Sequence, residues 1–454
     1  MEKEATEINN VLKEASPTFY SVLSNLGKRL YMPKGIIFQS NQSKKHAKSY
    51  NASIGIAKEN IGFSEGKGIS VENLAPMTLN SICKYLVGLE QNEIFNYAPQ
   101  PGLPVLRDYW HEKIVNQNPC LKSKEQISRP VLTGGLTHAI SLAAELFTDP
   151  GDDLYLADKF WENYSLIFNV KYQVNFVHYK LYKDDYSGFN LESLEETLSK
   201  SKKDKLVLLF NFPNNPTGYT ATEEEMDGIR DILVRIAEKG KKIVVLCDDA
   251  YYGLFYDKNI YPGSIFSKLA GIHDNIVAVK IDGISKECYA WGFRVGFITF
   301  ADNFQSVDGY GVMEEKAISG IRSSVSSCSS IAQAVLSHAI KDEDYSKERE
   351  EKYRILESRV AKVKEIVYRE EYKSYWDVYP FNSGYFMCLR IKDIPADTVR
   401  KHALFRYGLG TIAFDQDLRV AFSCISEENL ETVFQIIANS IEDIKKGDIE
   451  TGNE

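Results

Sequence analysis

The stretch SKECYAWGFRVG, residues 285–296, places a lysine directly after a serine and an arginine eight residues beyond that lysine. Its aromatic and small residues favour a compact, partly buried turn. Lys286 could pack its stem on apolar surface there or form an ion pair, as most lysines do. Alternatively, because desolvation lowers the pKa of a lysine, its neutral amine could form a Schiff base with an aldehyde. Arg294 would then lie close enough to bind a phosphate group on the same ligand.

Length and composition are those of an ordinary globular protein. The 454 residues suffice for two domains that each bury a core. Hydrophobic residues make up 44% of the chain and charged residues 26%. The net charge of −9 argues against a nucleic-acid-binding surface, because neutralising phosphates requires clustered lysine and arginine. We therefore expect no nucleic-acid partner.

The cysteines and the N-terminus bear on metal binding and location. Seven cysteines are scattered without CxxC spacing, so we expect no metal site and reduced thiols. Residues 1–5, MEKEA, do not begin a basic segment followed by an apolar one, as a secretory signal would. No apolar run approaches the about 18 residues that a membrane span requires. These features predict a cytoplasmic protein that does not enter the membrane.

Strands and helices alternate from about residue 130 onward. A short strand at 131–133 leads through Gly134 and Gly135 into an Ala- and Leu-rich helix. The clearest helix, 222–238, opens with a capping box formed by Thr222 and Glu225. Strands separated by helices predict a mostly parallel sheet covered on both faces. Further strands are expected at 154–156, 174–177, 206–210, 243–247, 276–281 and 295–299.

The remaining pattern predicts three regions. Residues 1–75 form an N-terminal segment that joins a small domain, 76–330 form the large domain, and 331–454 form a small α+β domain. A long, highly charged helix opens the small domain and has the character of a connector with two solvated faces. The other elements expected outside the sheet are helices at 79–89, 103–115 and 343–372, strands at 376–378, 385–391 and 419–422, and helices from 396 and 427.

Polar residues follow two of the predicted strands, where ligands of open α/β sheets bind. Asn215 lies in NFPNNPTG, which is either a plain turn or the source of an amide that donates to an aromatic hydroxyl. Asp248 follows the strand 243–247, and a buried carboxylate requires a partner, for which a cationic ring nitrogen is suitable. Tyr251, three residues later, could reach the hydroxyl of the same ring. Asp249 is the alternative carboxylate.

Two further strand ends suggest a phosphate site and a stacking surface. The turn at Gly134 and Gly135 opens a helix, whose N-terminal N–H groups bind anions. It lacks both GxGxxG and the lysine of a P-loop, so the phosphate of a small cofactor fits better than a nucleotide. Trp161, in DKFWENY, is either a core residue or a partner for a planar ring.

The motifs NPTG, DDAY and SK with GFRVG, in this order and spacing, closely resemble those of the class I/II aminotransferases of fold type I, which use pyridoxal 5′-phosphate. The resemblance extends from about Asn51 to the end of the chain. It implies an α/β large domain, with a mostly parallel seven-stranded sheet between helices, and a smaller α+β domain. It also implies the cofactor.

The resemblance implies a role for each residue around the cofactor ring. Lys286 forms the Schiff base and moves a proton between the substrate α-carbon and the cofactor C4′. Asp248 keeps the pyridine nitrogen protonated, so that the ring withdraws electrons. Tyr251 and Asn215 hydrogen-bond the ring hydroxylate, and Trp161 stacks on the ring.

For the phosphate, the resemblance implies backbone N–H groups of Gly135 and Leu136 and the guanidinium of Arg294. The sequence departs from the family in this phosphate site. Family members commonly carry a hydroxyl three residues before the lysine, where this chain has Gly283. Phosphate binding should then depend more on Arg294, Ser285 or the backbone.

The resemblance also implies partners beyond the cofactor. Tyr97 matches a tyrosine that reaches the phosphate of the neighbouring subunit, which implies a homodimer. Arg419 matches the arginine that clamps the substrate α-carboxylate, or is an ordinary strand-edge arginine. Gly55 matches a glycine of the segment that closes over the substrate. Arg322 lies near the place where dicarboxylate-specific members bind the distal carboxylate, although many relatives use it only at the dimer interface.

The function implied is transfer of an amino group between an α-amino acid and a 2-oxo acid by a ping-pong mechanism. A lyase or decarboxylase on the same fold is the first alternative, because cofactor-binding residues do not decide which substrate bond breaks. A non-catalytic cofactor-binding sensor domain is a remote alternative. The sequence leaves open whether the substrate is a dicarboxylate, an aromatic amino acid or another monocarboxylate.

Overall fold

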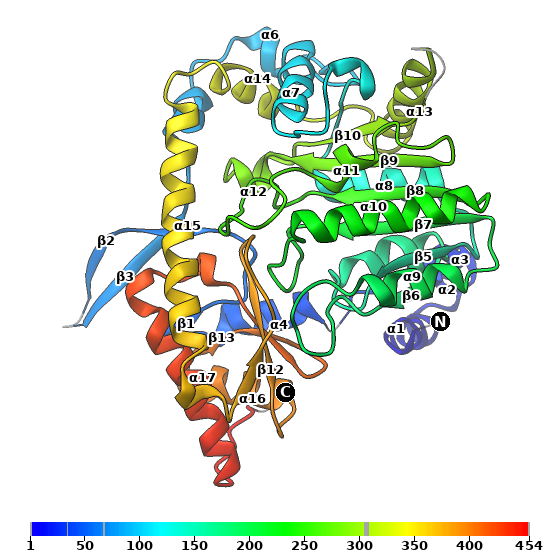
Figure 1. Cartoon of the computed structure of the whole chain (residues 1–454). Helices are drawn as coiled ribbons and strands as arrows, with labels where there is room; N and C mark the ends of the chain where they lie inside the picture. The colour runs from blue at the N-terminus through cyan, green and yellow to red at the C-terminus, as the bar shows by residue number, and fades with distance from the viewer. Residues whose placement is uncertain (1, 34, 67–68, 304–307, 453–454) are drawn as a thin grey trace.

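A sheet of seven strands forms the centre of the large domain (Figure 1). The computed structural model describes residues 2–33, 35–66, 69–303 and 308–452. The strand order is β4-β10-β9-β8-β7-β5-β6; β10 runs antiparallel to both its neighbours, and the other neighbouring pairs are parallel. Every strand predicted for this domain is confirmed with slightly different ends. The strands are β4 (Val131–Thr133), β5 (Asp153–Ala157), β6 (Asn175–Tyr179), β7 (Lys205–Asn211), β8 (Lys242–Asp248), β9 (Ile276–Gly283) and β10 (Gly296–Ala301).

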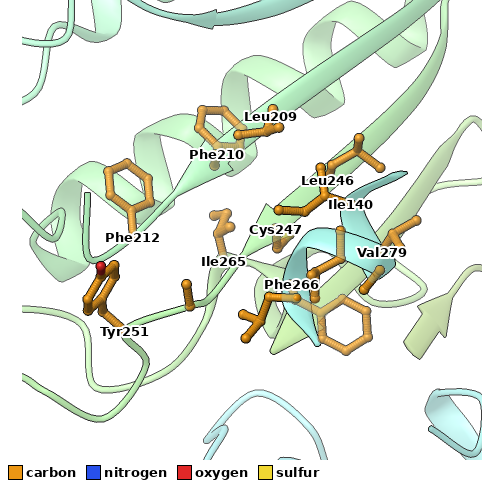
Figure 2. Close-up of a cluster of buried hydrophobic side chains, with 14 of the residues drawn as sticks. Ile140, Leu209, Phe210, Phe212, Leu246, Cys247, Tyr251, Ile265, Phe266 and Val279 are labelled. Atoms are coloured by element: carbon orange, nitrogen blue, oxygen red, sulfur yellow. The ribbon is translucent and has the colours of Figure 1, made fainter. Parts of the chain in front are cut away.

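Helices cover both faces of this sheet, α8 on one face and α9, α10 and α11 on the other (Figure 1). The predicted capping box opens α10, where the Thr222 hydroxyl accepts from the Glu225 N–H and the Glu225 carboxylate accepts from the Thr222 N–H. Figure 2 shows apolar side chains between the layers, among them Ile140, Leu246 and Phe266. The strands are apolar on both faces because both are covered. The covering helices are α8 (Leu136–Phe147), α9 (Leu191–Ser199), α10 (Glu223–Glu238) and α11 (Ile265–Leu269).

Further helices surround this core. The helix predicted at 79–89 is instead divided into α5 and η1, and η1 ends where Val87 adopts an extended backbone, followed by Gly88 with a positive φ of 80°. The one predicted at 103–115 is confirmed as α7. These helices are α5 (Asn80–Cys83), η1 (Lys84–Leu86), α6 (Gln91–Ile94), α7 (Pro104–Asn116), η2 (Lys124–Gln126), η3 (Ser165–Lys171), α12 (Ile284–Glu287), η4 (Trp291–Phe293), α13 (Asp308–Ser324) and α14 (Ser330–Ala339).

The two hydrophobic cores meet along α15 (Tyr345–Val367), the long helix at the side of the molecule in Figure 1. Its Leu356 packs in the core of the large domain, whereas Val360 packs in the core of the small domain. Val335, on α14, also belongs to the large core. The cores thus divide within α15, which follows the predicted boundary at residue 331. The predicted charged helix ends at Val367 and is followed by η5 (Glu370–Tyr372).

The small domain contains a four-stranded antiparallel sheet in the order β11-β12-β15-β14 and the parallel pair β1-β13. Helix α16 packs on β13, β14 and β15, and α15 and α17 contribute side chains to the same hydrophobic core as these strands. The described residues thus form the α+β unit expected after the large domain. Its elements are β1 (Tyr50–Asn51), β11 (Trp376–Val378), β12 (Met387–Ile391), α16 (Ala396–Tyr407), β13 (Leu409–Gly410), β14 (Ile412–Phe414), β15 (Asp417–Val420), η6 (Phe422–Cys424), η7 (Glu427–Asn429) and α17 (Leu430–Lys445).

The described elements of the predicted N-terminal segment, residues 1–75, contact different parts of the molecule. The first three helices lie beside the large domain, where the Arg29 Nε–H donates to the Val170 carbonyl at 3.0 Å. α4 instead packs on β13 and β14 of the small domain, and a hairpin of β2 and β3 projects outward (Figure 1). The elements are α1 (Lys3–Ala15), α2 (Pro17–Val22), α3 (Asn25–Arg29), α4 (Ile36–His46), β2 (Lys58–Gly66) and β3 (Ile69–Pro76).

Neither a membrane span nor a metal site is evident in the described ranges. No helix there combines the length and the apolar character needed to cross a membrane. The same residues contain no group of three or more His, Cys, Asp or Glu side chains placed to hold a metal ion.

Candidate active site

A cavity of about 420 Å³ lies at the carboxyl ends of β7 and β8, where the two domains and α4 meet. Its position is the one expected for the ligand site of an open α/β sheet. The structure therefore collects at one place side chains that lie far apart in the sequence. Of the predicted site residues, it brings together Gly55, Leu136, Trp161, Asn215, Asp248, Tyr251, Ser285, Lys286, Arg294 and Arg419.

Lys286 enters the cavity from α12, directly after β9. Its Nζ lies 5.0 Å from the centre of the Tyr251 ring. Removal from water lowers the pKa of Lys286 to about 8; the carboxylate of Asp248 acts in the opposite direction, and Arg294 adds to the lowering. A substantial fraction of the amine is therefore neutral near pH 8, as a nucleophile toward an aldehyde must be.

Asp248 ends β8 and is only 2% exposed. Burial raises the pKa of this carboxyl, and hydrogen bonds from Tyr164 and the Ala250 N–H oppose that rise, as does the charge of Lys286. Asp249, the alternative carboxylate, forms a buried ion pair with Lys280 and does not line the cavity. Because successive side chains of an extended chain point in opposite directions, only Asp248 faces the site.

Tyr164 is a site residue that the sequence analysis missed. It is fully buried, lines the cavity and donates its hydroxyl to Asp248. Its ring meets that of Trp161 edge to face, with 5.4 Å between the ring centres. The signal available in the sequence was the spacing WxxY, which places both rings on one side of a helical turn. Tyr164 thus contacts both Trp161, the predicted stacking residue, and Asp248, the predicted carboxylate.

Arg419, on β15, is 3% exposed and points into the cavity. Its Nη1 donates to the Asn215 side-chain oxygen at 3.0 Å, and its Nη2 donates to the Ser53 carbonyl at 2.9 Å. The Nε is buried and has no hydrogen-bond partner among the described residues. The guanidinium also lies over the Phe386 ring, 4.2 Å from its centre. A buried guanidinium with a free donor is suited to a carboxylate ligand.

The opposite end of the cavity gathers hydrogen-bond donors that lack acceptors. Gly135, with a φ of 90°, precedes the N-terminus of α8, and a Cβ there would overlap the Arg294 guanidinium. Arg294 Nη1 donates to the Trp291 carbonyl at 3.1 Å. The Ser285 hydroxyl and the Trp291 Nε1 are both buried and have no partner in the described part of the chain. Together with the first N–H groups of α8, these donors fit a phosphate group.

Close backbone packing explains why no hydroxyl stands at Gly283. A Cβ there would lie 2.7 Å from both the Gly296 Cα and the Val295 carbonyl oxygen. At Gly296, a Cβ would in turn lie 2.7 Å from the carbonyl carbon of Gly135. The ends of β9 and β10 and the turn after β4 are therefore stacked through three glycines. Trp291, which the sequence analysis did not assign to the phosphate, and Ser285 offer donors in place of the missing hydroxyl.

The family described as Aminotransferase class I and II matches residues 68–437. The chain belongs to this family. A probable aspartate/prephenate aminotransferase of Aquifex aeolicus is 28% identical over 218 residues, which are 46% of this chain and 50% of that protein. A probable aspartate aminotransferase of Methanocaldococcus jannaschii is 24% identical over 208 residues, 46% of this chain and 49% of that protein. The chain thus spans about half the length of the curated relatives it matches.

Solved structures share the fold of this aminotransferase-family chain. An aminotransferase from Anaerococcus prevotii has a TM-score of 0.76 and 24% identity, and the match covers 90% of this chain and 96% of that one. The predicted fold class, fold type I with a smaller second domain, is confirmed.

Two residues predicted for the site of this aminotransferase-family protein lie outside the cavity of the single subunit. Tyr97 is 89% exposed in the loop before α7. Arg322 lies near the end of α13, is exposed and donates from Nη1 to the Ser326 hydroxyl at 2.6 Å. Within one subunit, neither side chain can act on a ligand in the cavity.

The sequence analysis also missed α4, which forms one wall of the cavity in this family member. Five of its residues line the site, and all of them precede Asn51, near which the family resemblance begins. Successive residues of this group are one or three positions apart in the sequence, which places them on a single helical face. That face consists of Ile36, Ile37, Ser40, Asn41 and Lys44.

Proposed function

We propose that this protein is a pyridoxal 5′-phosphate-dependent aminotransferase, which moves an amino group between an α-amino acid and a 2-oxo acid by a ping-pong mechanism. The observation that carries the proposal is the presence of Lys286, Asp248 and Arg419 in one cavity. They provide an amine with a lowered pKa, a buried carboxylate and a carboxylate-binding arginine. Membership of the family supports the same assignment.

Each part of the cavity suits one part of the cofactor. When bound, pyridoxal 5′-phosphate supplies an aldehyde and an electron-withdrawing ring. Asp248 would hold the ring nitrogen, and Trp161 would stack on the ring face. Tyr251 and Asn215 would hydrogen-bond the ring hydroxyl. The phosphate would be held by the donors at the other end, Gly135, Leu136, Ser285, Trp291 and Arg294.

The chain's own residues then bind the substrate and move its proton. Arg419 holds the α-carboxylate, which leaves the amino group directed toward Lys286. The Lys286 amine would accept the proton from the substrate α-carbon and, as the ammonium, would donate it again at the cofactor C4′. A pKa of about 8 suits both directions, because the amine gains and loses a proton readily near neutral pH.

A panel of amino donors with 2-oxoglutarate tests this function. We expect at least one donor to yield glutamate and the matching 2-oxo acid in equal amounts, because each turnover carries one amino group from donor to acceptor. Chromatography of the products measures both. Release of ammonia or carbon dioxide without glutamate would instead identify a lyase or decarboxylase.

We also propose that the protein works as a homodimer in which Tyr97 reaches the phosphate site of the partner subunit. Exposed apolar residues that shortly precede Tyr97 in the chain support an interface here, since Phe95 is 81% exposed and Val87 is 76% exposed. Exposed apolar groups gathered in one region commonly mark a protein interface. Sedimentation equilibrium should give twice the chain mass of 51.5 kDa. A monomer at micromolar concentration would contradict this part of the proposal.

A further inference from the structure

We propose that Lys44, on α4, binds the distal anionic group of an acidic substrate and so makes this protein selective for dicarboxylates. The inference rests on the proposed function and adds a substrate class and a specificity residue to it. Three observations carry it: how α4 is held across the cavity, which side chains it presents there, and how the charges of the cavity balance.

α4 is attached to both domains. At its start, the Ile36 N–H donates to the Glu162 carboxylate at 2.7 Å, directly after the predicted stacking residue Trp161. Farther along, the Gln39 side chain makes two hydrogen bonds of 2.7 Å with the backbone of Ala413, on β14. The 11-residue helix is about 16 Å long, so it crosses the cavity from the ring-stacking side to the small domain.

The later part of α4 lies close to the carboxylate-binding side. Ser43 is fully buried and packs against Gly410: a Cβ added to Gly410 would lie only 2.7 Å from the Ser43 Cβ. Gly410 belongs to β13, which pairs with β1. Two residues after the end of β1 comes Ser53, whose carbonyl accepts a hydrogen bond from Arg419. Lys44 follows Ser43 directly and lines the cavity. The cation is therefore placed on the side where the substrate, not the cofactor phosphate, is expected.

The face that α4 turns to the cavity changes character along its length. Ile36 and Ile37 are apolar, Ser40 and Asn41 are uncharged and polar, and Lys44 is cationic. A substrate side chain that has an aliphatic stem and an anionic end matches such a surface. A large aromatic side chain would instead leave the Lys44 ammonium without a partner.

The charges of the cavity leave one cation unassigned. Among the described residues that line it, the cationic side chains are those of Lys44, Lys286, Arg294 and Arg419, and the only carboxylate is that of Asp248. In the proposed function, three of these cations act on the aldehyde, the phosphate and the α-carboxylate, and Asp248 holds the ring nitrogen. Lys44 is exposed to water and has no ion pair within the described part of the chain. A second substrate carboxylate would balance it.

Binding of succinate and butyrate to the cofactor-loaded protein tests the role of Lys44. These unreactive acids have the same number of carbons, but only succinate carries a second carboxylate. Lys44→Gln is expected to weaken succinate binding about tenfold or more, while butyrate binding changes much less. The matched control is Lys45→Gln, which removes the neighbouring cation of α4; Lys45 is exposed, as Lys44 is, but does not line the cavity. Titration calorimetry measures each dissociation constant.

Kinetic selectivity gives a second readout. The ratio of kcat/KM for glutamate to that for its neutral analogue glutamine should fall about tenfold or more in Lys44→Gln and stay constant in Lys45→Gln. The inference would be overturned if Lys44→Gln lost affinity equally for succinate and butyrate, lost kcat/KM equally for glutamate and glutamine, or lost neither. So would a loss of succinate preference in Arg322→Gln but not in Lys44→Gln, which would assign the distal site to Arg322. If the parent protein transfers an amino group from no donor, the proposed function itself is wrong. That outcome is distinct from a failure of the Lys44 inference.

Discussion

Lys286→Ala is expected to eliminate the visible absorbance of the protein-bound cofactor and to lower kcat by about 10³-fold or more. The reason is geometric as well as chemical. Among the described residues, Lys286 is the primary amine beside both Asp248 and Tyr251, and its pKa is lowered to about 8. Absorbance spectra of the purified variant with added cofactor, together with single-turnover assays, measure the two losses.

Folding should not limit this experiment. The Lys286 amine forms no ion pair or side-chain hydrogen bond within the described residues, so its removal deletes no polar contact. The matched control is Lys286→Arg, which keeps a positive charge but has no amine that forms a stable Schiff base. Both variants should melt near the parent and be equally inactive. Full turnover in Lys286→Ala would refute the assignment.

Asp248→Asn is expected to lower kcat by about 10²- to 10³-fold. An amide of nearly the same shape cannot supply the negative charge that keeps the ring nitrogen protonated. The substitution has a second effect with a definite sign. Because the Asp248 carboxylate raises the pKa of Lys286, its removal should shift the pH midpoint for cofactor capture below about 8. Stopped-flow absorbance between pH 6 and 10, values chosen to span that pKa, measures the shift.

The neighbouring carboxylate provides the control. Asp249→Asn leaves the cavity unchanged but breaks the buried pair with Lys280. We expect a loss of about 3 kcal/mol in the free energy of unfolding and little change in kcat for the folded fraction. The reverse outcome, with kcat lost in Asp249→Asn and kept in Asp248→Asn, would transfer the ring-nitrogen role to Asp249.

Local patterns predicted the large domain well. The predicted strands 206–210 and 243–247 are short apolar runs bounded by turn residues, so the positions of β7 and β8 and the ligand-binding edge followed from the sequence alone. The choice of Asp248 over Asp249 also agrees with the structure, where only Asp248 lines the cavity. Because successive side chains of a strand point in opposite directions, only one of two adjacent residues at a strand end can face the ligand.

Other parts depend on contacts between distant segments and could not be predicted in this way. The sequence of α4 has a weak apolar pattern, and its place is set by Glu162 and Ala413, which lie far away in the chain. Tyr164 becomes a partner of Asp248 only after β5 and β8 are placed in one sheet. The division between the domains fell inside α15, because one continuous helix serves two cores.

The glycine stack restricts how the phosphate site can change. Restoring the usual hydroxyl by Gly283→Ser would force β9 away from β10, and Gly296 holds β10 equally close to Gly135. A side chain at Gly283 would require the backbone at Val295 and Gly296 to move, and one at Gly296 would require the backbone at Gly135 to move. At Gly135, a side chain would instead displace the Arg294 guanidinium. Side chains outside the stack, such as Ser285 and Trp291, are where single substitutions can adjust cofactor affinity.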